Sequence, residues 1–151
     1  MEQWKDVPGY EGMYEVSDEG RVRSLYRIVK SSSSRGVVFD KPYPSKMLRE
    51  ADNRGYSIVV LCKGGVPKPF TIHRLVMLAF VGPKPDGLQI NHLNGRKDDN
   101  HVSNLEYCTL SENLLHRHRV LGIVSKRPPM KESTKKKIGL KVRAAWGRGC
   151  Y

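Results

Sequence analysis

The segment from residue 88 to residue 122 constrains the fold of this chain more than any other part of the sequence. Residues 88–92 predict a strand, residues 93–103 predict a polar loop, and residues 105–108 predict a partner strand. Thr109 and Glu112 form a capping box and Gly122 supplies a left-handed stop, so we expect a helix over residues 110–121. This order of elements brings the end of the first strand beside the first turn of the helix.

Three polar residues are expected to meet at that junction. Asn91 and His92 end the strand, and Asn113 lies in the first turn of the helix. A neutral imidazole can deprotonate a water near neutral pH, so His92 is a candidate general base. The side-chain carbonyl oxygens of Asn91 and Asn113 suit a hard cation such as Mg²⁺. The residues predict a one-metal hydrolytic site, and two neutral ligands predict that the metal binds appreciably only in a complex with DNA.

The residues ahead of this unit predict two β-hairpins. Residues 4–25 alternate apolar and polar side chains around an Asp-Glu-Gly turn, and the apolar runs at residues 57–62 and 69–72 flank a Gly-Gly turn. Between the hairpins, residues 31–46 contain four consecutive serines and two prolines. Such a composition predicts a mobile loop.

One short helix is expected between the second hairpin and the strand at residue 88. Residues 74–80 change to a helical period, with Leu75, Leu78 and Ala79 on one apolar stripe and His73 at the head of the helix. The expected fold class is therefore α+β. N-terminal antiparallel hairpins precede a strand–strand–helix unit and a basic tail.

The charge of the chain indicates a polyanionic partner. The sequence has 27 Lys and Arg residues against 15 Asp and Glu residues, a formal net charge of +12, and such an excess usually indicates nucleic acid or an acidic membrane surface. No stretch approaches the roughly 20 apolar residues of a membrane-spanning helix, and no signal-peptide pattern opens the chain, so a membrane partner is not expected. The three cysteines are widely spaced and predict a reducing, intracellular compartment.

A longer pattern resembles a known family. The runs His73-Arg74-Leu75-Val76, Ile90 to Asn100, Ser103 to Thr109 and Ser111-Glu112-Asn113 are similar in order and spacing to the HNH endonucleases of bacteriophages and their group I introns. Residues 4–25 resemble a nuclease-associated modular motif that commonly precedes such cores, and residues 133–139 resemble a second, shorter DNA-binding repeat. The resemblance implies a ββα-metal fold and a metal-dependent homing endonuclease, cytoplasmic inside a bacterial host cell if it is phage-encoded.

The resemblance also implies roles for four residues. His92 would activate the water, Asn91 and Asn113 would bind one divalent cation, Mg²⁺ or Mn²⁺, and Asn104 would hold the loop and orient the histidine through side-chain hydrogen bonds. The sequence departs from the commonest family pattern by carrying Asn at position 91, often Asp in relatives, and Asn in place of His at position 113. Both departures occur in the homing branch.

The expected DNA contacts are basic side chains near this site and along the rest of the chain. Arg21 and Arg23 alternate with Val22 and share one face of the first hairpin, which either lies along a DNA groove or is an ordinary solvated face. The lysine run at residues 135–137 would attract phosphates without regard to sequence, or form a solvated tail. The expected contacts are Arg21, Arg23, His73, Arg74, Arg96, Lys97, His116, Arg117, Lys135, Lys136 and Lys137.

The chain is expected to divide into three regions. Residues 1–72 would form a β-rich DNA-binding region, residues 73–123 the catalytic core and residues 124–151 a basic DNA-binding tail. Double-stranded DNA is the expected partner, and one site in a monomer predicts nicking. The alternative is a DNA-binding protein that keeps the scaffold without useful catalysis, which composition does not separate from a nuclease. An RNA-binding β-domain would require clustered aromatics on adjacent strands, which the sequence lacks.

Overall fold

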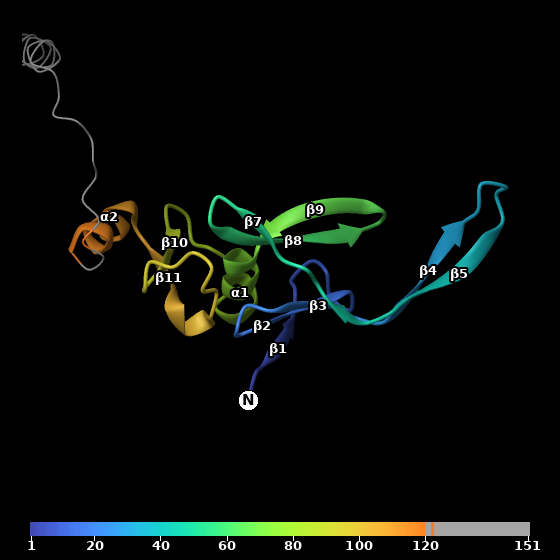
Figure 1. Cartoon of the computed structure of the whole chain (residues 1–151), viewed down its shortest axis with the longest axis horizontal. Coiled ribbons are helices and arrows are strands. Elements are labelled where there is room, and N and C mark those ends of the chain that lie inside the picture. Colours follow the sequence, from blue (N-terminus) through green and yellow to red (C-terminus); the bar gives the residue numbers. More distant parts are fainter. Residues whose placement is uncertain (120–121, 123–151) are drawn as a thin grey trace, which may run out of the picture.

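The computed structural model describes residues 1–119 and residue 122. Its strands form four antiparallel sheets. The elements follow one another along the long axis, from helix α2 (Leu110–Arg119) at one end to the hairpin of β4 (Arg27–Ser32) and β5 (Val38–Tyr43) at the other (Figure 1). Helix α1 (Ile72–Phe80) lies between these ends. The α+β class, with hairpins ahead of a strand–strand–helix unit, is confirmed.

The first sheet has the strand order β1-β2-β3-β6. The predicted hairpin is β2 (Tyr14–Ser17) with β3 (Val22–Ser24), and β1 (Trp4–Asp6) and β6 (Lys46–Met47) add to its two edges. The period-2 pattern buries the expected apolar side chains on one face, because alternate residues of a strand point to the same side. At three and two residues, β1 and β6 are too short to show a period, so the sequence did not predict them.

The predicted loop over residues 31–46 is wrong in its secondary structure. Strands β4 and β5 pair from Arg27↔Tyr43 to Ser32↔Val38, and the serines after Ser32 form the turn, where Gly36 has a φ of 79°. Pro42 is accommodated because the two strands pair only with each other, so each has a free edge that needs no donor. The β-branched and aromatic residues of both strands outweighed the serines and prolines.

The second predicted hairpin is confirmed. Strand β8 (Tyr56–Lys63) pairs with β9 (Val66–Thr71), and β7 (Ala51–Asn53) adds to the other side of β8. Gly64 and Gly65 make the turn with φ values of 60° and 80°. Two consecutive positive φ angles match the twist of a tight hairpin, which explains the paired glycines.

Helix α1 lies at the centre of the hydrophobic core. It contacts β1, β2, β8, β9 and β11 (Leu105–Cys108). Its buried residues are Ile72, His73, Leu75, Val76 and Met77. Within the predicted stripe, Leu75 is buried, Ala79 is half-buried and packs against the core, and Leu78 is half-buried. The helix is covered from several sides, and its buried face is therefore wider than one stripe and shifted toward its N-terminus.

The hydrophobic core contains residues from both of the first two regions that we expected, residues 1–72 and 73–123. Its buried members are Val7, Tyr14, Val16, Val22, Val59, Leu61, Ile72, Leu75, Val76, Met77 and Leu105. These side chains come from both sides of the predicted boundary between residues 72 and 73, and that boundary falls inside the first turn of α1. The first two predicted regions therefore share one core.

The strand–strand–helix unit forms as predicted. Strand β10 (Gln89–His92) pairs with β11, and a single 3₁₀ turn (Val102–Asn104) leads into β11. The capping box is present, because the Glu112 amide donates to Thr109 Oγ1 at 3.2 Å and the Thr109 amide donates to Glu112 Oε2 at 2.8 Å. Gly122 has the expected left-handed φ of 61°. The end of the predicted helix at residue 121 and the tail over residues 124–151 lie outside the described residues. In the described part, no helix is long and apolar enough to cross a membrane.

Candidate active site

Strand β10 positions the two central residues of the candidate site. Asn91 lies opposite Glu106 and His92 opposite Leu105 in the antiparallel register with β11. Successive side chains of a strand point to opposite faces, so Asn91 and His92 face different sides of this ribbon. Both residues are buried, at 6% exposure.

The Asn91 side chain is fixed by its partner across the strands. Asn91 Nδ2 donates to Glu106 Oε1 at 2.8 Å. Asn113, in the first turn of α2, donates from its own Nδ2 to Gln89 Oε1 at 3.2 Å. Gln89 and Asn91 share a face of β10 because they are two residues apart. The helix therefore contacts the start of the strand through Gln89, whereas we expected it to meet the end of the strand.

The two asparagines fit a hard divalent cation. Each amide donates through nitrogen to a protein acceptor, and within the described residues no group donates to either carbonyl oxygen. Such oxygens are ligands that Mg²⁺ and Mn²⁺ accept, with waters and phosphate oxygens filling the remaining positions. No group of three or more His, Cys, Asp or Glu side chains able to hold a metal occurs in residues 1–119. The candidate donor set is therefore neutral, and the phosphate must supply negative charge.

His92 is enclosed by aromatic rings. The centroid of its ring lies 5.3 Å from that of His73 and 6.1 Å from that of Tyr56. Burial lowers the pKa of His92 below its ordinary value of 6.5, against the opposing influence of the Asn100 side chain and the carboxylates of Asp99 and Asp98. The enclosure therefore favours the neutral imidazole, which is the form that can accept a proton.

One nitrogen of His92 faces the interior. His92 Nε2 is buried and has no hydrogen-bond partner within the described residues, and the same holds for Asn100 Oδ1. Asn100 is itself 5% exposed and donates from Nδ2 to the carbonyl oxygen of Asp98 at 3.1 Å. Buried polar atoms without partners are uncommon, and such a pair of atoms around one imidazole is typical of a site whose polar groups serve function.

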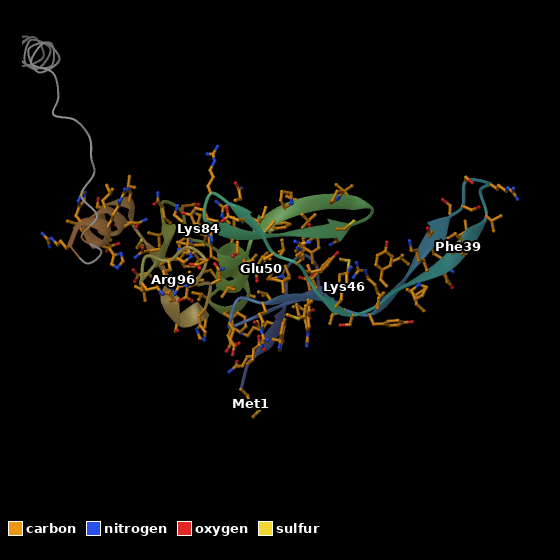
Figure 2. All side chains as sticks on the ribbon, viewed as in Figure 1. Met1, Phe39, Lys46, Glu50, Lys84 and Arg96 are labelled. Carbon is orange, nitrogen blue, oxygen red and sulfur yellow. The ribbon has the colours of Figure 1, made fainter. Side chains whose placement is uncertain are left out.

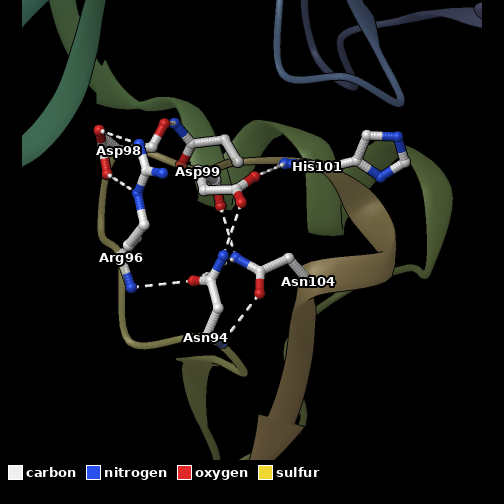
Figure 3. Close-up of polar contacts among 7 residues, drawn as sticks. Asn94, Arg96, Asp98, Asp99, His101 and Asn104 are labelled. Carbon is white, nitrogen blue, oxygen red and sulfur yellow. Dashed lines mark hydrogen bonds and ion pairs between the residues drawn. The ribbon is translucent and has the colours of Figure 1, made fainter.

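Asn104 ties together the loop between the strands. Its Nδ2 donates to Asn94 Oδ1 at 3.1 Å and to the backbone carbonyl oxygen of Asp99 at 2.8 Å. Its Oδ1 accepts from the backbone N–H of Asn94 at 3.0 Å (Figure 3). The predicted clamp on the loop is therefore present. The expected side-chain bonds from Asn104 to His92 are not among its contacts, because both ends of its amide point into the loop.

Three basic side chains lie close to the rings around His92 or to the cavity beside them. Arg74 and Lys84 line a cavity of about 360 Å³ together with His73, Tyr56 and Gln89. Lys97 lies over the Tyr56 ring at 4.4 Å, so it is near the rings that enclose His92. Arg96 instead pairs with Asp98 at 3.2 Å (Figure 3). The expected contacts Arg74 and Lys97 thus lie beside the candidate site, and Arg96 has its charge partly compensated.

The remaining expected DNA contacts are distributed elsewhere. Arg21 and Arg23 share a face as predicted, because both lie over the Trp4 ring, but Arg21 pairs with Glu2 and Arg23 pairs with Glu15 at 2.6 Å. His116 is half-buried on α2 and Arg117 is exposed beside it. Lys135, Lys136 and Lys137 lie outside the described residues.

Four residues of this neighbourhood were missed by the sequence analysis. Glu106 and Gln89 hold the two asparagine amides, and their places follow from the β10–β11 register once its pairing is known. From the sequence, we interpreted Asn100 as a turn-forming residue without a role in the site. Tyr56 reaches His92 from the first residue of β8, and no local pattern in the sequence links it to this site.

Two family models match the chain. A NUMOD4 motif matches residues 2–62, and an HNH endonuclease model matches residues 70–115. The second match contains Asn91, His92, Asn104 and Asn113. The first contains the four-stranded sheet, the β4–β5 hairpin and most of β8.

Several curated proteins are similar to the chain. The DNA endonuclease I-HmuI of Bacillus phage SP01 is 35% identical over 112 residues, which are 74% of this chain and 55% of that protein. The SPbeta prophage-derived putative HNH homing endonuclease YosQ of Bacillus subtilis (strain 168) is 40% identical over 44% of this chain and 38% of its own length. The chain thus spans about half the length of the first of these relatives.

A solved structure is similar over most of the chain. It is a structure of the HNH homing endonuclease I-HmuI, and its description concerns DNA binding and cleavage by that protein. The match has a TM-score of 0.62 at 31% identity and covers 90% of this chain and 65% of that chain. The arrangement of strands and helices described above is therefore that of a solved nuclease.

Proposed function

Because this chain belongs to the HNH endonucleases, with a NUMOD4 motif ahead of the nuclease domain, we propose that it cleaves double-stranded DNA in a divalent-metal-dependent reaction with His92 as general base. The observation that carries the proposal is the enclosed imidazole of His92, next in sequence to the fixed amide of Asn91. Hydrolysis of a phosphodiester needs a base and a site for the phosphate. We assign the first role to His92 and the second to the cavity lined by Arg74, Lys84 and His73, whose ring packs against that of His92.

The tautomer of His92 follows from its surroundings. We place the proton on His92 Nε2 with Asn100 Oδ1 as its acceptor, because both atoms are buried without a hydrogen-bond partner in the described part of the chain and the Asn100 side chain raises the pKa of His92. With the proton on Nε2, Nδ1 is the basic nitrogen and takes a proton from the attacking water. Asn100 thus positions the base, and His73 and Tyr56 restrict the orientation of its ring.

Asn91 and Asn113 would hold the divalent cation through their carbonyl oxygens. When bound, the cation supplies Lewis acid stabilisation to the phosphate and the leaving oxygen. Glu106 and Gln89 hold the two amides so that the oxygens stay available. Arg74 and Lys84 attract the phosphate toward the cavity beside His73. One site per monomer hydrolyses one strand, so a nicked duplex is the proposed product.

The test is conversion of supercoiled plasmid at low salt with Mg²⁺, with Mn²⁺ and with a chelator. Open circles should appear only with metal, and His92→Ala should abolish them while retaining plasmid retardation on a gel. His101→Ala is the matched control, because His101 is an exposed loop histidine with no proposed role in cleavage and should leave nicking unchanged. Retarded but uncut plasmid under every condition would identify a binding protein that keeps the scaffold. Direct linear product would show paired cuts and contradict the proposed nicking.

A further inference from the structure

The face of the β10–β11 ribbon that carries Asn91 also carries a carboxylate. Glu106 lies directly opposite Asn91 in the antiparallel register, and residues opposite one another lie on the same face. Asn113 of α2 reaches this face as well, because its amide contacts Gln89, two residues before Asn91 on β10. Asn91, Glu106 and Asn113 therefore belong to one side of the ribbon, and His92 belongs to the other.

Glu106 has an oxygen that its hydrogen bond to Asn91 does not use. Its Oε1 accepts from Asn91 Nδ2 at 2.8 Å, and in the part of the chain that the structure describes no donor contacts Oε2. Lys and Arg are plentiful in a chain with a formal net charge of +12. Even so, none of those within residues 1–119 forms an ion pair with Glu106. The carboxylate is exposed to solvent, so this oxygen is accessible to a cation from outside the chain.

The Glu106 carboxylate and the first turn of α2 approach the same buried side chain. Cys108 shares the face of Glu106 because it lies two residues further along β11. Burial, followed by the carboxylates of Glu106 and Glu112, raises the pKa of the Cys108 thiol. Glu112 is the neighbour of Asn113 in the first turn of α2. Glu106 therefore acts on the same residue as the helix turn that carries Asn113.

We propose that Glu106 is a third ligand of the divalent cation that Asn91 and Asn113 would hold. This inference rests on the proposed endonuclease function and deepens it, because it gives the protein's own donor set a negative charge. Without Glu106, the two amide oxygens are neutral and leave that charge to the phosphate. Carboxylate and amide oxygens together suit Mg²⁺ and Mn²⁺. The oxygen that binds the cation is the one that the Asn91 amide does not use.

A carboxylate ligand changes when the metal can bind. Two neutral ligands predict appreciable binding only in the complex with DNA. The added carboxylate predicts measurable binding by the free protein, because affinity rises with the number of charged ligands. Glu106→Gln separates this role from the hydrogen bond, since the Gln carbonyl oxygen still accepts from Asn91 Nδ2 while the negative charge is lost. A residue that only held the asparagine amide would tolerate the change.

The first test measures Mn²⁺ binding by the free, full-length protein, from the electron paramagnetic resonance signal of unbound Mn²⁺. Glu106→Gln should weaken binding at least about tenfold. Glu50→Gln is the matched control, because Glu50 is exposed between β6 and β7 (Figure 2) and undergoes the same change of charge. It should keep the wild-type affinity.

A double variant, Asn91→Asp with Glu106→Gln, moves the carboxylate to the facing strand. The hydrogen bond between the two positions is kept with its donor and acceptor exchanged, because the Gln amide can donate to the Asp carboxylate. The register places both positions on the same face. The double variant should therefore regain most of the Mn²⁺ affinity that Glu106→Gln loses.

A second measurement distinguishes a ligand from a nearby charge. Eu³⁺ is a hard cation that takes oxygen ligands, and its luminescence lifetimes in H₂O and D₂O count the waters on the bound ion. Glu106→Gln should add at least about one water, because water fills the position that the carboxylate leaves. Weaker binding with an unchanged number of waters would mean that Glu106 acts through space, and would overturn the ligand proposal.

The remaining outcomes separate this proposal from the endonuclease proposal. Wild-type Mn²⁺ affinity in Glu106→Gln, or no binding by the free wild-type protein, would overturn the ligand proposal and leave the endonuclease proposal intact. Wild-type affinity in Asn113→Ala would place the ion elsewhere and overturn the ligand proposal too. Weaker binding and an added water in Glu106→Gln, with no metal-dependent nicking by wild-type protein, would support the ligand and overturn the endonuclease proposal alone.

Discussion

The imidazole rings of His73 and His92 lie edge to face, with their centroids 5.3 Å apart and an interplanar angle of 80°. Both residues are buried, one in the first turn of α1 and the other at the end of β10. Burial lowers the pKa of His73 to about 4, and burial also lowers the pKa of His92. The pair is therefore packed in its uncharged form, because two imidazolium ions at this distance would repel one another.

Protonation of His73 should destabilise the fold in mildly acidic solution. Its pKa is about 4 in the folded chain and near 6.5 in the unfolded chain, so the unfolded chain binds the proton first as the pH falls. The stabilising contribution is fully present above pH 6.5 and is lost progressively between pH 6.5 and 4, by up to about 3 kcal/mol. Urea unfolding at pH 7.5 and pH 5 measures it. His73→Gln should lose less stability over this interval than wild type, and equal losses would contradict the assignment to His73.

The pH dependence of cleavage should report the neutral form of His92. A general base works when it is unprotonated, and the pKa of His92 is lowered by burial. The rate should therefore be constant above about pH 6.5 and fall only at lower pH. Initial nicking rates from pH 5 to pH 8, with plasmid binding measured separately at each pH, test this. An acidic limb centred above pH 6.5 would show that another group limits the reaction.

Gly20 provides a test of the contact between the N-terminal sheet and the active-site loop. It has a φ of 85°, and a Cβ added there would lie 2.7 Å from Asn100 Cβ. Gly9 has nearly the same φ, 84°, with nothing within 4 Å of an added Cβ. Gly9→Ala should cost about 1 kcal/mol from backbone conformation, and Gly20→Ala about 1 to 3 kcal/mol more from the clash.

Thermal or urea unfolding measures the two costs, and plasmid nicking measures their effect on the site. Because Asn100 faces His92, Gly20→Ala should also reduce the nicking rate under conditions where both variants are folded. Similar stability and similar rates for the two variants would mean that the loop moves away from Gly20 without affecting the base.

Asn104 should contribute to both stability and rate through the loop. Asn104→Ala removes three hydrogen bonds at a residue that is 9% exposed. Its partners are the exposed Asn94 and the half-buried Asp99, so the loss should cost about 1 to 2 kcal/mol. A loosened loop should also lower the nicking rate at least tenfold. Ser103→Ala, at the exposed neighbour, should change stability by less than about 0.5 kcal/mol. A stable Asn104→Ala protein with slow nicking would instead indicate a direct role for this side chain in the reaction.

The sequence predicted the parts of the site that depend on local pattern. The β10–β11 pair and the Thr109 capping box follow from apolar periodicity and from hydrogen bonds within a few residues, so they were predicted correctly. The partners of the site residues depend on tertiary packing. Tyr56 reaches His92 from another sheet, and the Asn104 amide turns into the loop away from the histidine. The β4–β5 hairpin was missed because its serines and prolines are typical of a loop, and only the cross-strand pairing identifies it as a hairpin.

The shared core has a consequence for how the two matched segments can be exchanged in evolution. The two matched families meet at the Asp18 carbonyl, which accepts from the Val102 amide at 2.8 Å, and at Gly20 against Asn100. Helix α1 packs against strands of both matched segments. Without the other segment, each would therefore expose its apolar face to solvent. The two matched segments therefore share one folding unit. A crossover between them would expose apolar surface on each unless compensating changes arose on both sides of the contact, whereas exchange of the β4–β5 hairpin would leave the shared core intact.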